Sequence, residues 1–244
     1  MGIVVAVTSG KGGTGKTSIT GGVASSLAQM GRSVLCIDMD IGLRNLDISL
    51  GLNDRALMDF SDVALGRCPL ARAAVVHPQL KNLSLLTSPM SLPASLTAER
   101  VRALLDTART MYDYILIDAP AGLGAGFRLA VCGADRVLVI ATNDASSLRD
   151  AQRTVTQLDS IRQVHLVMNR IQPRLLRKLR TTIDDAMNTA GLPLLGVVPE
   201  DPQVMLSANL GQPLVNRGKR GAALACWNIA TRLDGGQVPI MRIR

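Results

Sequence analysis

Two lysines and four glycines lie within eight residues near the start of the chain. Residues 10–17 read Gly-Lys-Gly-Gly-Thr-Gly-Lys-Thr, which fills every position of the pattern G-x-x-x-x-G-K-[ST]. Glycine permits the positive φ angles and the close backbone approach that let successive N–H groups surround a phosphate at the start of a helix. We therefore predict a phosphate loop over 10–17, with these contacts: Gly10, Lys11, Gly12, Gly13, Thr14, Gly15, Lys16, Thr17 and Ser18.

The last two residues of the phosphate loop have distinct predicted roles. Lys16 supplies a mobile positive charge for the β- and γ-phosphates of a nucleotide, and the Thr17 hydroxyl is an oxygen ligand for Mg²⁺. The apolar run before the loop predicts a strand, and the apolar spacing after it predicts a helix. This context is the one that the motif requires; the alternative is an ordinary glycine-rich turn between a strand and a helix.

Three aspartates follow two other apolar runs and are candidates for metal binding and catalysis. Asp118 comes after the apolar residues 114–117, where a carboxylate supports Mg²⁺ beside Thr17. Asp38 and Asp40 are two positions apart at the end of another run, so both carboxylates can point the same way. We assign Asp38 to the metal shell and Asp40 to orienting the attacking water. The alternatives are a capping or turn aspartate at 118 and a solvated pair at 38 and 40.

Strand-like and helix-like patterns alternate along the chain. Apolar, β-branched runs predict strands at 3–8, 33–38, 83–87, 114–118, 136–142, 164–168 and 194–198. Helical spacing predicts helices at about 16–30, 97–110, 126–132, 146–160, 173–190, 202–210 and 219–233. The alternation predicts an α/β fold, a mainly parallel doubly wound sheet with helices on both faces. Ligands bind at the carboxyl ends of such strands, so the phosphate loop and the three aspartates should meet there.

Composition narrows the class of protein. The 244 residues predict one domain over 1–234 and a short tail over 235–244. Only five residues are aromatic, which argues against stacking on nucleic acid bases as the main activity. A net charge of +8 favours anionic partners, and the four widely spaced cysteines indicate neither a zinc nor an iron–sulfur site. With no signal peptide or membrane-spanning run in the sequence, we expect a cytoplasmic protein.

These motifs resemble those of the MinD/ParA superfamily. The phosphate loop is similar to the deviant Walker A box of that superfamily, and residues 38–47, Asp-Met-Asp-Ile-Gly-Leu-Arg-Asn-Leu-Asp, look like the matching segment of its MinD members. Further similar segments lie at 118–122, 142–143, 146–150, 198–201 and 207–213. The similarity runs from about residue 3 to residue 233.

The resemblance implies an ATP- and Mg²⁺-dependent switch that dimerises with ATP, hydrolyses it, and regulates placement of the division septum. In this family Lys11 is the signature lysine, which reaches across the homodimer to the phosphates of the other subunit. Lys11, Lys16 and Asp40 are then catalytic, and Thr17, Asp38 and Asp118 serve the metal. Adenine would contact Asn169 and the segment Pro199, Glu200 and Asp201. The alternative for Asn169 is a turn residue that ends a strand.

Partners are also implied by the resemblance. A MinC- or MinE-like regulator would bind near Arg149 and Asp150, unless these are ordinary exposed charges of a helix. The chain departs from the family at the tail, which is too short and too interrupted by Gly and Pro for the amphipathic membrane helix of MinD proteins. We expect the tail to pack on its own domain. A peripheral position at the inner face of the cell membrane therefore stays open.

Two alternative functions remain, a ParA-like DNA-partitioning ATPase and a MinD-related regulator of flagellar number. ParA-like members bind DNA nonspecifically. Two basic clusters are candidates for such contacts, although solvated helix faces are the favoured interpretation because no aromatic residues or recognition motif accompany them: Arg174, Arg177, Lys178 and Arg180, and Arg217, Lys219 and Arg220.

Overall fold

The strands of the molecule form one sheet. The structure is a computed structural model that describes residues 1–53 and 55–241. Its strands are β1 (Ile3–Thr8), β2 (Val34–Asp38), β3 (Val75–Val76), β4 (Leu83–Leu86), β5 (Tyr114–Asp118), β6 (Arg136–Ala141), β7 (Gln163–Ile171) and β8 (Leu194–Pro199). Their order across the sheet is β3-β4-β2-β5-β1-β6-β7-β8, and every pairing is parallel except that of β3 with β4. The phosphate-loop strand, β1, thus lies near the centre.

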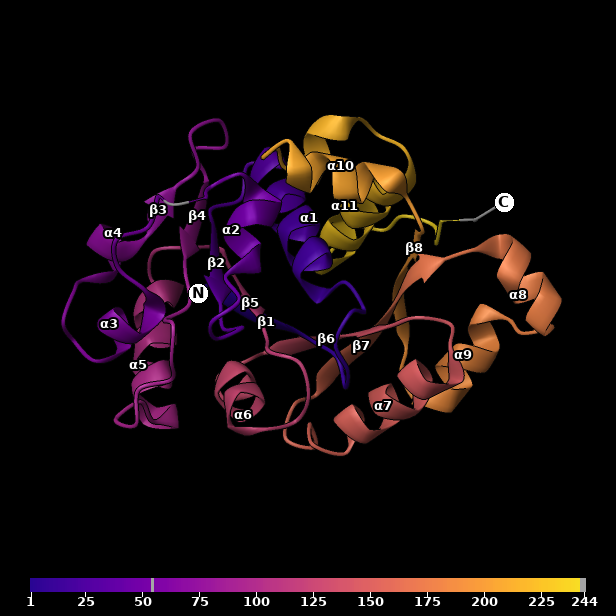
Figure 1. Cartoon of the computed structure of the whole chain (residues 1–244), viewed down its shortest axis with the longest axis horizontal. Helices are drawn as coiled ribbons and strands as arrows, with labels where there is room; N and C mark the ends of the chain where they lie inside the picture. Colours follow the sequence, from indigo (N-terminus) through magenta and orange to yellow (C-terminus); the bar gives the residue numbers. More distant parts are fainter. Residues whose placement is uncertain (54, 242–244) are drawn as a thin grey trace.

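Helices cover both faces of the sheet (Figure 1). They are α1 (Lys16–Gln29), α2 (Asn45–Leu50), α3 (Phe60–Ala64), α4 (Leu70–Ala73), α5 (Ala98–Arg109), α6 (Ala125–Val131), α7 (Ala145–Val155), α8 (Pro173–Leu179), α9 (Ile183–Ala190), α10 (Pro202–Asn209), the 3₁₀ helix η1 (Leu214–Arg217) and α11 (Gly221–Leu233). In Figure 1, α1, α2, α10 and α11 lie above the sheet, and α5, α6, α7 and α9 lie below it.

Alternate residues of the strands build two apolar layers. In β1, Val4 and Ala6 pack in the layer that contains α5, α6 and α7, whereas Val5 and Val7 pack in the layer that contains α1 and α11. Successive side chains of a strand point to opposite faces, so a continuous apolar run serves both layers. The predicted doubly wound parallel sheet with helices on both faces is confirmed.

The prediction of one helix over 173–190 is wrong. Arg180 has φ 52°, a left-handed conformation that ends α8. Thr182 then starts α9 with a capping box, in which its side chain accepts from the N–H of Asp185 and the Asp185 carboxylate accepts from the N–H of Thr182. The short elements α2, α3, α4, η1 and β3 were not predicted: the four helices have only four to six residues, too few to show a helical period, and β3 has only two.

The tail packs on its own domain as far as it is described. The guanidinium of Arg232 donates to the carbonyls of Val238 and Pro239, and Ile240 and Met241 line a pocket beside α8 and α9. Arg242, Ile243 and Arg244 lie outside the described residues. No helix within 1–53 and 55–241 is long and apolar enough to span a bilayer.

His77 connects the end of α2 to the turn before β4. Its ring is buried; Nε2 lies 3.0 Å from the carbonyl of Leu50, and Nδ1 accepts from the N–H groups of Gln79 and Leu80. Because Nδ1 is an acceptor, the ring must be neutral with its proton on Nε2. Burial lowers the pKa of His77, the Leu50 hydrogen bond opposes this, and the charges of Arg55 and Lys81 add to it.

We expect the stability advantage of the parent chain over a His77→Gln variant to narrow at acid pH. The pKa of histidine in the unfolded chain is about 6.5, which is above the lowered pKa of His77 in the folded state. The contribution of neutral His77 is therefore complete above the unfolded pKa and is lost as the pH falls toward the folded pKa. Urea unfolding of both proteins between pH 5 and 8 measures it. A stability difference that is constant over this range would contradict the prediction.

Candidate nucleotide-binding site

The phosphate loop joins the carboxyl end of β1 to the start of α1. Gly13 and Gly15 have φ angles of 78° and 90°, which a side chain would strain. Gly15 caps α1 without a side chain, so the first N–H groups of this helix keep their hydrogen-bonding capacity for an anion. Lys16 is buried, and its ammonium lies 3.2 Å from the Ser9 hydroxyl.

Two residues at the end of β7 brace the phosphate loop. The side-chain amide of Asn169 donates to the carbonyl of Thr14 over 2.7 Å, and a Cβ on Gly15 would collide with that amide. Arg170 donates to the carbonyl of Gly13 and forms an ion pair of 2.8 Å with Glu200. Asn169, which the sequence predicted to contact adenine, thus holds the loop in the structure, and its adenine contact stays a prediction. The bracing role of Arg170 was not predicted.

The two buried aspartates lie side by side in register. Asp38 ends β2 and Asp118 ends β5, and the two Cα positions pair across these neighbouring strands. Asp38 accepts from the N–H of Asp40 over 2.9 Å and from the N–H of Leu46 over 3.2 Å, so both of its oxygens hold the turn before α2. Asp118 Oδ1 accepts from Thr20 over 3.3 Å, but buried Oδ2 has no hydrogen-bond partner within the described residues.

The charges of this pocket perturb one another. Burial, followed by the negative charge of Asp38, raises the pKa of Asp118 to about 7, against the opposing effects of Thr17 and Lys16. Burial also raises the pKa of Asp38 to about 6, although the N–H groups of Asp40 and Leu46 oppose it. Burial lowers the pKa of Lys16, and the charges of Asp118 and Asp40 act against that shift. The pocket therefore holds excess negative charge that a cation would relieve.

The residues present fit a Mg²⁺ ion. Buried Asp118 Oδ2 lacks a partner, and the hydroxyl of Thr17 interacts with this carboxylate. No cluster of three or more His, Cys, Asp or Glu side chains suited to a metal occurs in the part of the chain that the structure describes. This donor set suits Mg²⁺, which commonly takes one or two protein ligands and completes its shell with water and substrate phosphates. Asp38 was also predicted to serve the metal, but both of its oxygens accept backbone N–H groups, so it is less available as a direct ligand than Asp118.

Lys11 lies at the exposed rim of the site. Its ammonium is 3.1 Å from Asp144 and 2.9 Å from the Ser146 hydroxyl, at the start of α7. Partial burial alone would raise the pKa of Asp144, but hydrogen bonds hold it well below its usual range; they come from Ser146, Thr142, the Ser147 N–H and Lys11. Asp144 was not predicted as a site residue. It follows the carboxyl end of β6, and a charged residue at such a strand end is a sign of a ligand-binding site.

The predicted adenine residues line one cavity of about 480 Å³ beside the phosphate loop. Asn169, Pro199, Glu200 and Asp201 are all among its lining residues, as is Ser18 of the loop. The Asp201 carboxylate accepts from the N–H groups of Gln203 and Ala222, so it caps α10 and holds the start of α11. The apolar wall was not predicted, because its residues come from α10, η1 and α11: Val204, Met205, Ala208, Leu214, Ala222 and Cys226.

The candidate regulator residues lie on α7. Arg149 is exposed, whereas Asp150 is partly buried. The backbone of Asp150 lies so close to Gly10 of the phosphate loop that a Cβ added to Gly10 would collide with it. Asp150 also lies 3.8 Å from Arg153. The two candidates thus differ: Arg149 is accessible to a partner, and Asp150 is in contact with the loop.

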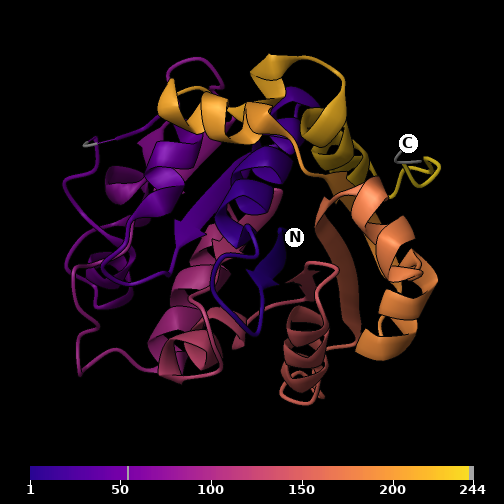
Figure 2. The same cartoon turned by 45° about the vertical axis from the view of Figure 1, so that its right-hand side comes forward.

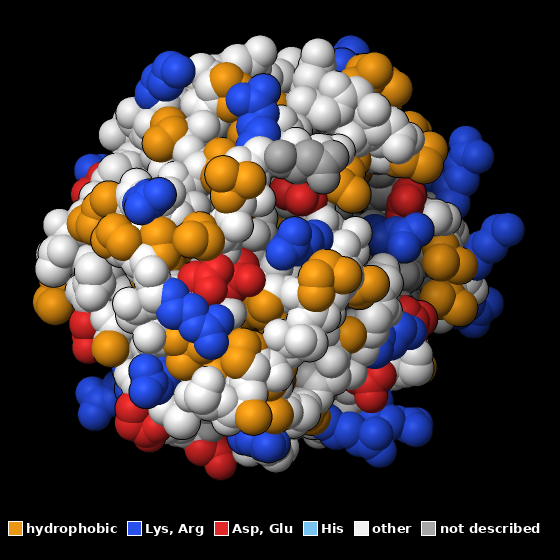
Figure 3. Space-filling view, turned by 60° about the vertical axis from the view of Figure 1, so that its left-hand side comes forward, with side chains coloured by type: hydrophobic (Ala, Val, Ile, Leu, Met, Phe, Trp, Pro, Cys, Tyr) orange, Lys and Arg blue, Asp and Glu red, His pale blue; other side chains and the backbone are white. Residues whose placement is uncertain are grey.

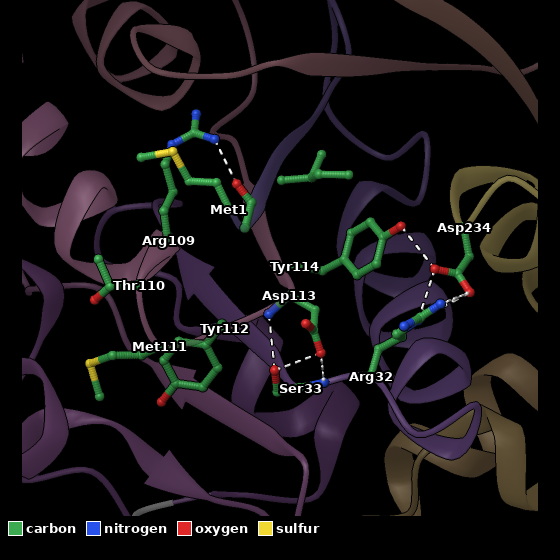
Figure 4. Close-up of a pocket in the computed structure, with 12 residues that line it drawn as sticks. Met1, Arg32, Ser33, Arg109, Thr110, Met111, Tyr112, Asp113, Tyr114 and Asp234 are labelled. Carbon is green, nitrogen blue, oxygen red and sulfur yellow. Dashed lines mark hydrogen bonds and ion pairs between the residues drawn. The ribbon is translucent and has the colours of Figure 1, made fainter.

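A second polar pocket, of about 440 Å³, lies at the opposite ends of the strands (Figure 4). Its charged groups are paired: Arg32 with Asp234, and Arg109 with Asp135 and the carbonyl of Gly2. Ser33 donates to Asp113. We interpret this pocket as a seam between elements, because its charged and polar side chains satisfy one another.

A glycine-rich loop between a strand and a helix, with its lysine close to the buried carboxylate of Asp118 and the partly buried carboxylate of Asp40, defines a P-loop nucleotide-binding protein. Residues 5–215 match the family model described as the CobQ/CobB/MinD/ParA nucleotide binding domain. The chain belongs to this family, as its motifs predicted.

Known relatives place the chain near MinD within that family. It is 38% identical over 255 residues to the septum site-determining protein MinD of Helicobacter pylori, covering 100% of this chain and 95% of the relative. The MinC:MinD cell division protein complex of Aquifex aeolicus superposes with a TM-score of 0.91 at 36% identity and 98% coverage of each chain. MinD of Pyrococcus horikoshii, solved with Mg-ADP, gives 0.83 at 27% identity and 96% coverage of each chain. The chain is thus a MinD-like ATPase of the septum site-determining family.

Proposed function

We propose that the chain is a Mg-ATP-dependent dimerisation switch that regulates placement of the division septum. We base this on the different surroundings of two lysines in one loop. Lys16 is buried among acidic groups, whereas Lys11 lies at an exposed rim, bonded only to surface residues Asp144 and Ser146 among the described residues. A cation at the rim is accessible to the phosphates of a second subunit, which is the role that the family gives to this lysine.

The residues of one subunit divide the work of the reaction. The loop N–H groups and Lys16 bind the phosphates, and the cavity beside Asn169 and Pro199 takes the adenine. Thr17 and Asp118 would hold Mg²⁺, which would supply positive charge beside the phosphates. Asp40 orients the attacking water, and burial raises the pKa of this carboxyl against the effect of Lys16. A carboxylate of raised pKa accepts a proton more readily.

Apolar side chains beside the Asp40 turn support a contact with a second molecule. Leu43 and Met90 are 63% and 71% exposed, and their segments adjoin through the hydrogen bond from the Gly42 N–H to the Pro89 carbonyl. Figure 3, which brings the left-hand side of Figure 1 forward, shows hydrophobic side chains among lysines and arginines on that face of the molecule. Association removes such side chains from water, so we place the homodimer contact around this turn.

A MinC- or MinE-like protein is the proposed regulator. The MinC:MinD complex of Aquifex aeolicus is similar to this chain over 98% of its length. Arg149 is exposed on α7, the helix whose first turn holds Lys11 through Ser146, so a partner bound there would act close to the signature lysine.

Replacing Lys11 by alanine is expected to abolish ATP-dependent dimerisation and to reduce hydrolysis about 10³-fold, the range found for cations supplied by a second subunit. ATP binding by the monomer should be retained, because Lys16 and the loop N–H groups remain. Sedimentation velocity with ATP and with ADP, together with phosphate release, measures both effects. Arg153→Ala removes an exposed cation of α7 and serves as the control. A Lys11→Ala chain that still dimerised and hydrolysed ATP normally would contradict the proposed switch.

A further inference from the structure

The helix α8 differs from the other helices in how little of it is buried. None of its residues from Pro173 to Leu179 is fully buried, and only Pro173 and Leu176 turn toward the domain, where they line the pocket shared with Ile240 and Met241 of the tail. Figures 1 and 2 both show α8 at the edge of the molecule, and Ile240 and Met241 of the described tail share its pocket. A seven-residue helix is marginal in water without burial. Burial of its exposed side against another surface would stabilise α8.

The exposed side of α8 combines leucines with unpaired cations. Leu175 and Leu179 are 39% and 51% exposed and lie one helical turn apart. Arg174 and Lys178, at the same spacing, flank them on the helix surface. Within the described residues, none of the four cations of this segment takes part in an ion pair: Arg174, Arg177, Lys178 and Arg180.

The helix itself explains only some of these charges. Arg177 and Lys178 lie in the last turn, where a cation interacts favourably with the helix dipole. Arg174 lies in the first turn, where the positive end of the helix dipole repels a cation. Arg174 also repels Lys178, four residues further along the helix. Arg174 and the two exposed leucines thus cost stability in the isolated chain. An anionic surface with an apolar interior would reverse both costs.

We infer that α8 is an interfacial contact for an anionic lipid surface. The four cations meet the headgroups, while Leu175 and Leu179 enter the boundary between headgroups and acyl chains. A nucleic acid backbone would use the cations but would leave the leucines in water, and α8 has no aromatic side chain for stacking on bases. This contact lies outside the nucleotide site, so it stands whether or not the proposed switch is correct.

Vesicle co-sedimentation of the full chain tests the contact. We expect the parent chain to sediment with vesicles of phosphatidylglycerol and phosphatidylcholine, and not with phosphatidylcholine alone, both with and without ATP. Arg174→Gln/Lys178→Gln should weaken the apparent affinity for the vesicles about 30-fold, because each cation near an anionic surface contributes roughly fivefold to the affinity. Leu175→Gln/Leu179→Gln should weaken it about tenfold at unchanged charge. Arg72→Gln/Lys81→Gln, which removes two exposed cations near β3 and β4, should stay within about twofold of the parent.

Several outcomes would overturn the inference. They are no vesicle binding by the parent chain, full binding by the leucine variant, and loss of binding by Ile240→Gln alone, which would make the tail the anchor. Binding of random duplex DNA that only the cation variant loses, with no vesicle binding, would assign α8 to nucleic acid. ATP hydrolysis without vesicles is measured on the same variants and should be unchanged. A lack of hydrolysis in the parent would count against the proposed switch and not against α8.

Discussion

Replacement of Lys16 by alanine is expected to reduce ATP hydrolysis by at least about 10³-fold and to weaken nucleotide binding. Lys16 is the one lysine of the phosphate loop that is buried, and its charge interacts with both Asp118 and Asp40. The site already holds negative charge that burial makes unfavourable, as the raised pKa values of Asp118 and Asp38 show. Without Lys16, the phosphates of ATP would add further negative charge with no fixed side-chain cation to offset it.

Phosphate release and binding of a fluorescent ATP analogue measure the effect of Lys16→Ala. The matched control is Lys81→Ala, which removes an exposed lysine at the far edge of the sheet and should leave turnover unchanged. Circular dichroism should show the same helix content in both variants, because the backbone bonds of α1 do not involve this side chain. Hydrolysis within about tenfold of the parent would show that the loop N–H groups alone bind the phosphates, and the assignment of Lys16 would be wrong.

Replacement of Asp40 by alanine is expected to reduce hydrolysis about 10²- to 10⁴-fold while ATP binding and dimerisation persist. The turn around Asp40 should survive the change because its bonds use the backbone. The Asp40 N–H donates to Asp38, and its carbonyl accepts from the Ser88 hydroxyl and the Leu43 N–H. The substitution removes only the carboxylate that we propose to orient the water. We therefore expect a dimer that binds ATP and does not hydrolyse it.

Sedimentation velocity in ATP separates this outcome from simple loss of function. The Asp40→Ala chain should sediment as a stable dimer in ATP, whereas the parent returns to monomer as ATP is consumed. Asp106→Ala, which removes an exposed carboxylate of α5, should behave like the parent. If the Asp40→Ala chain stayed monomeric in ATP, Asp40 would be needed for binding or association, and its water-positioning role would lose its basis.

The sequence located the phosphate loop and two strand-end aspartates correctly, because their signal is local. The phosphate loop is a continuous stretch in which a separate physical requirement explains each glycine, the lysine and the threonine. Its place between a strand and a helix follows from the apolar pattern on either side. Asp38 and Asp118 were found because each ends an apolar run, and parallel strands bring their carboxyl ends to one edge. All strands except β3 were predicted for the same reason: a strand buried on both faces is a continuous apolar run.

Local patterns could not predict which hydrogen-bond partners each site residue finds, because those partners come from distant parts of the sequence. Asp38 and Asp118 look alike in the chain, but the turn before α2 occupies both oxygens of Asp38 and leaves Oδ2 of Asp118 without a partner among the described residues. Lys11 meets Asp144 across a sequence separation of 133 residues, and Asn169 meets Thr14 across 155. The apolar wall of the adenine cavity comes from helices after the last strand, whose approach no local period encodes.

The sequence by itself thus determined that the chain is a MinD-like P-loop protein, because a phosphate cradle and its strand-end carboxylates are built from short stretches with strict residue requirements. Only the tertiary structure decided the distribution of the charges: Lys16 is buried, Lys11 lies at the rim, and the cations of α8 have no ion-pair partner among the described residues. The physical reason is that burial and hydrogen bonding to distant elements set the state of a charged group, and both depend on the packing of the whole chain.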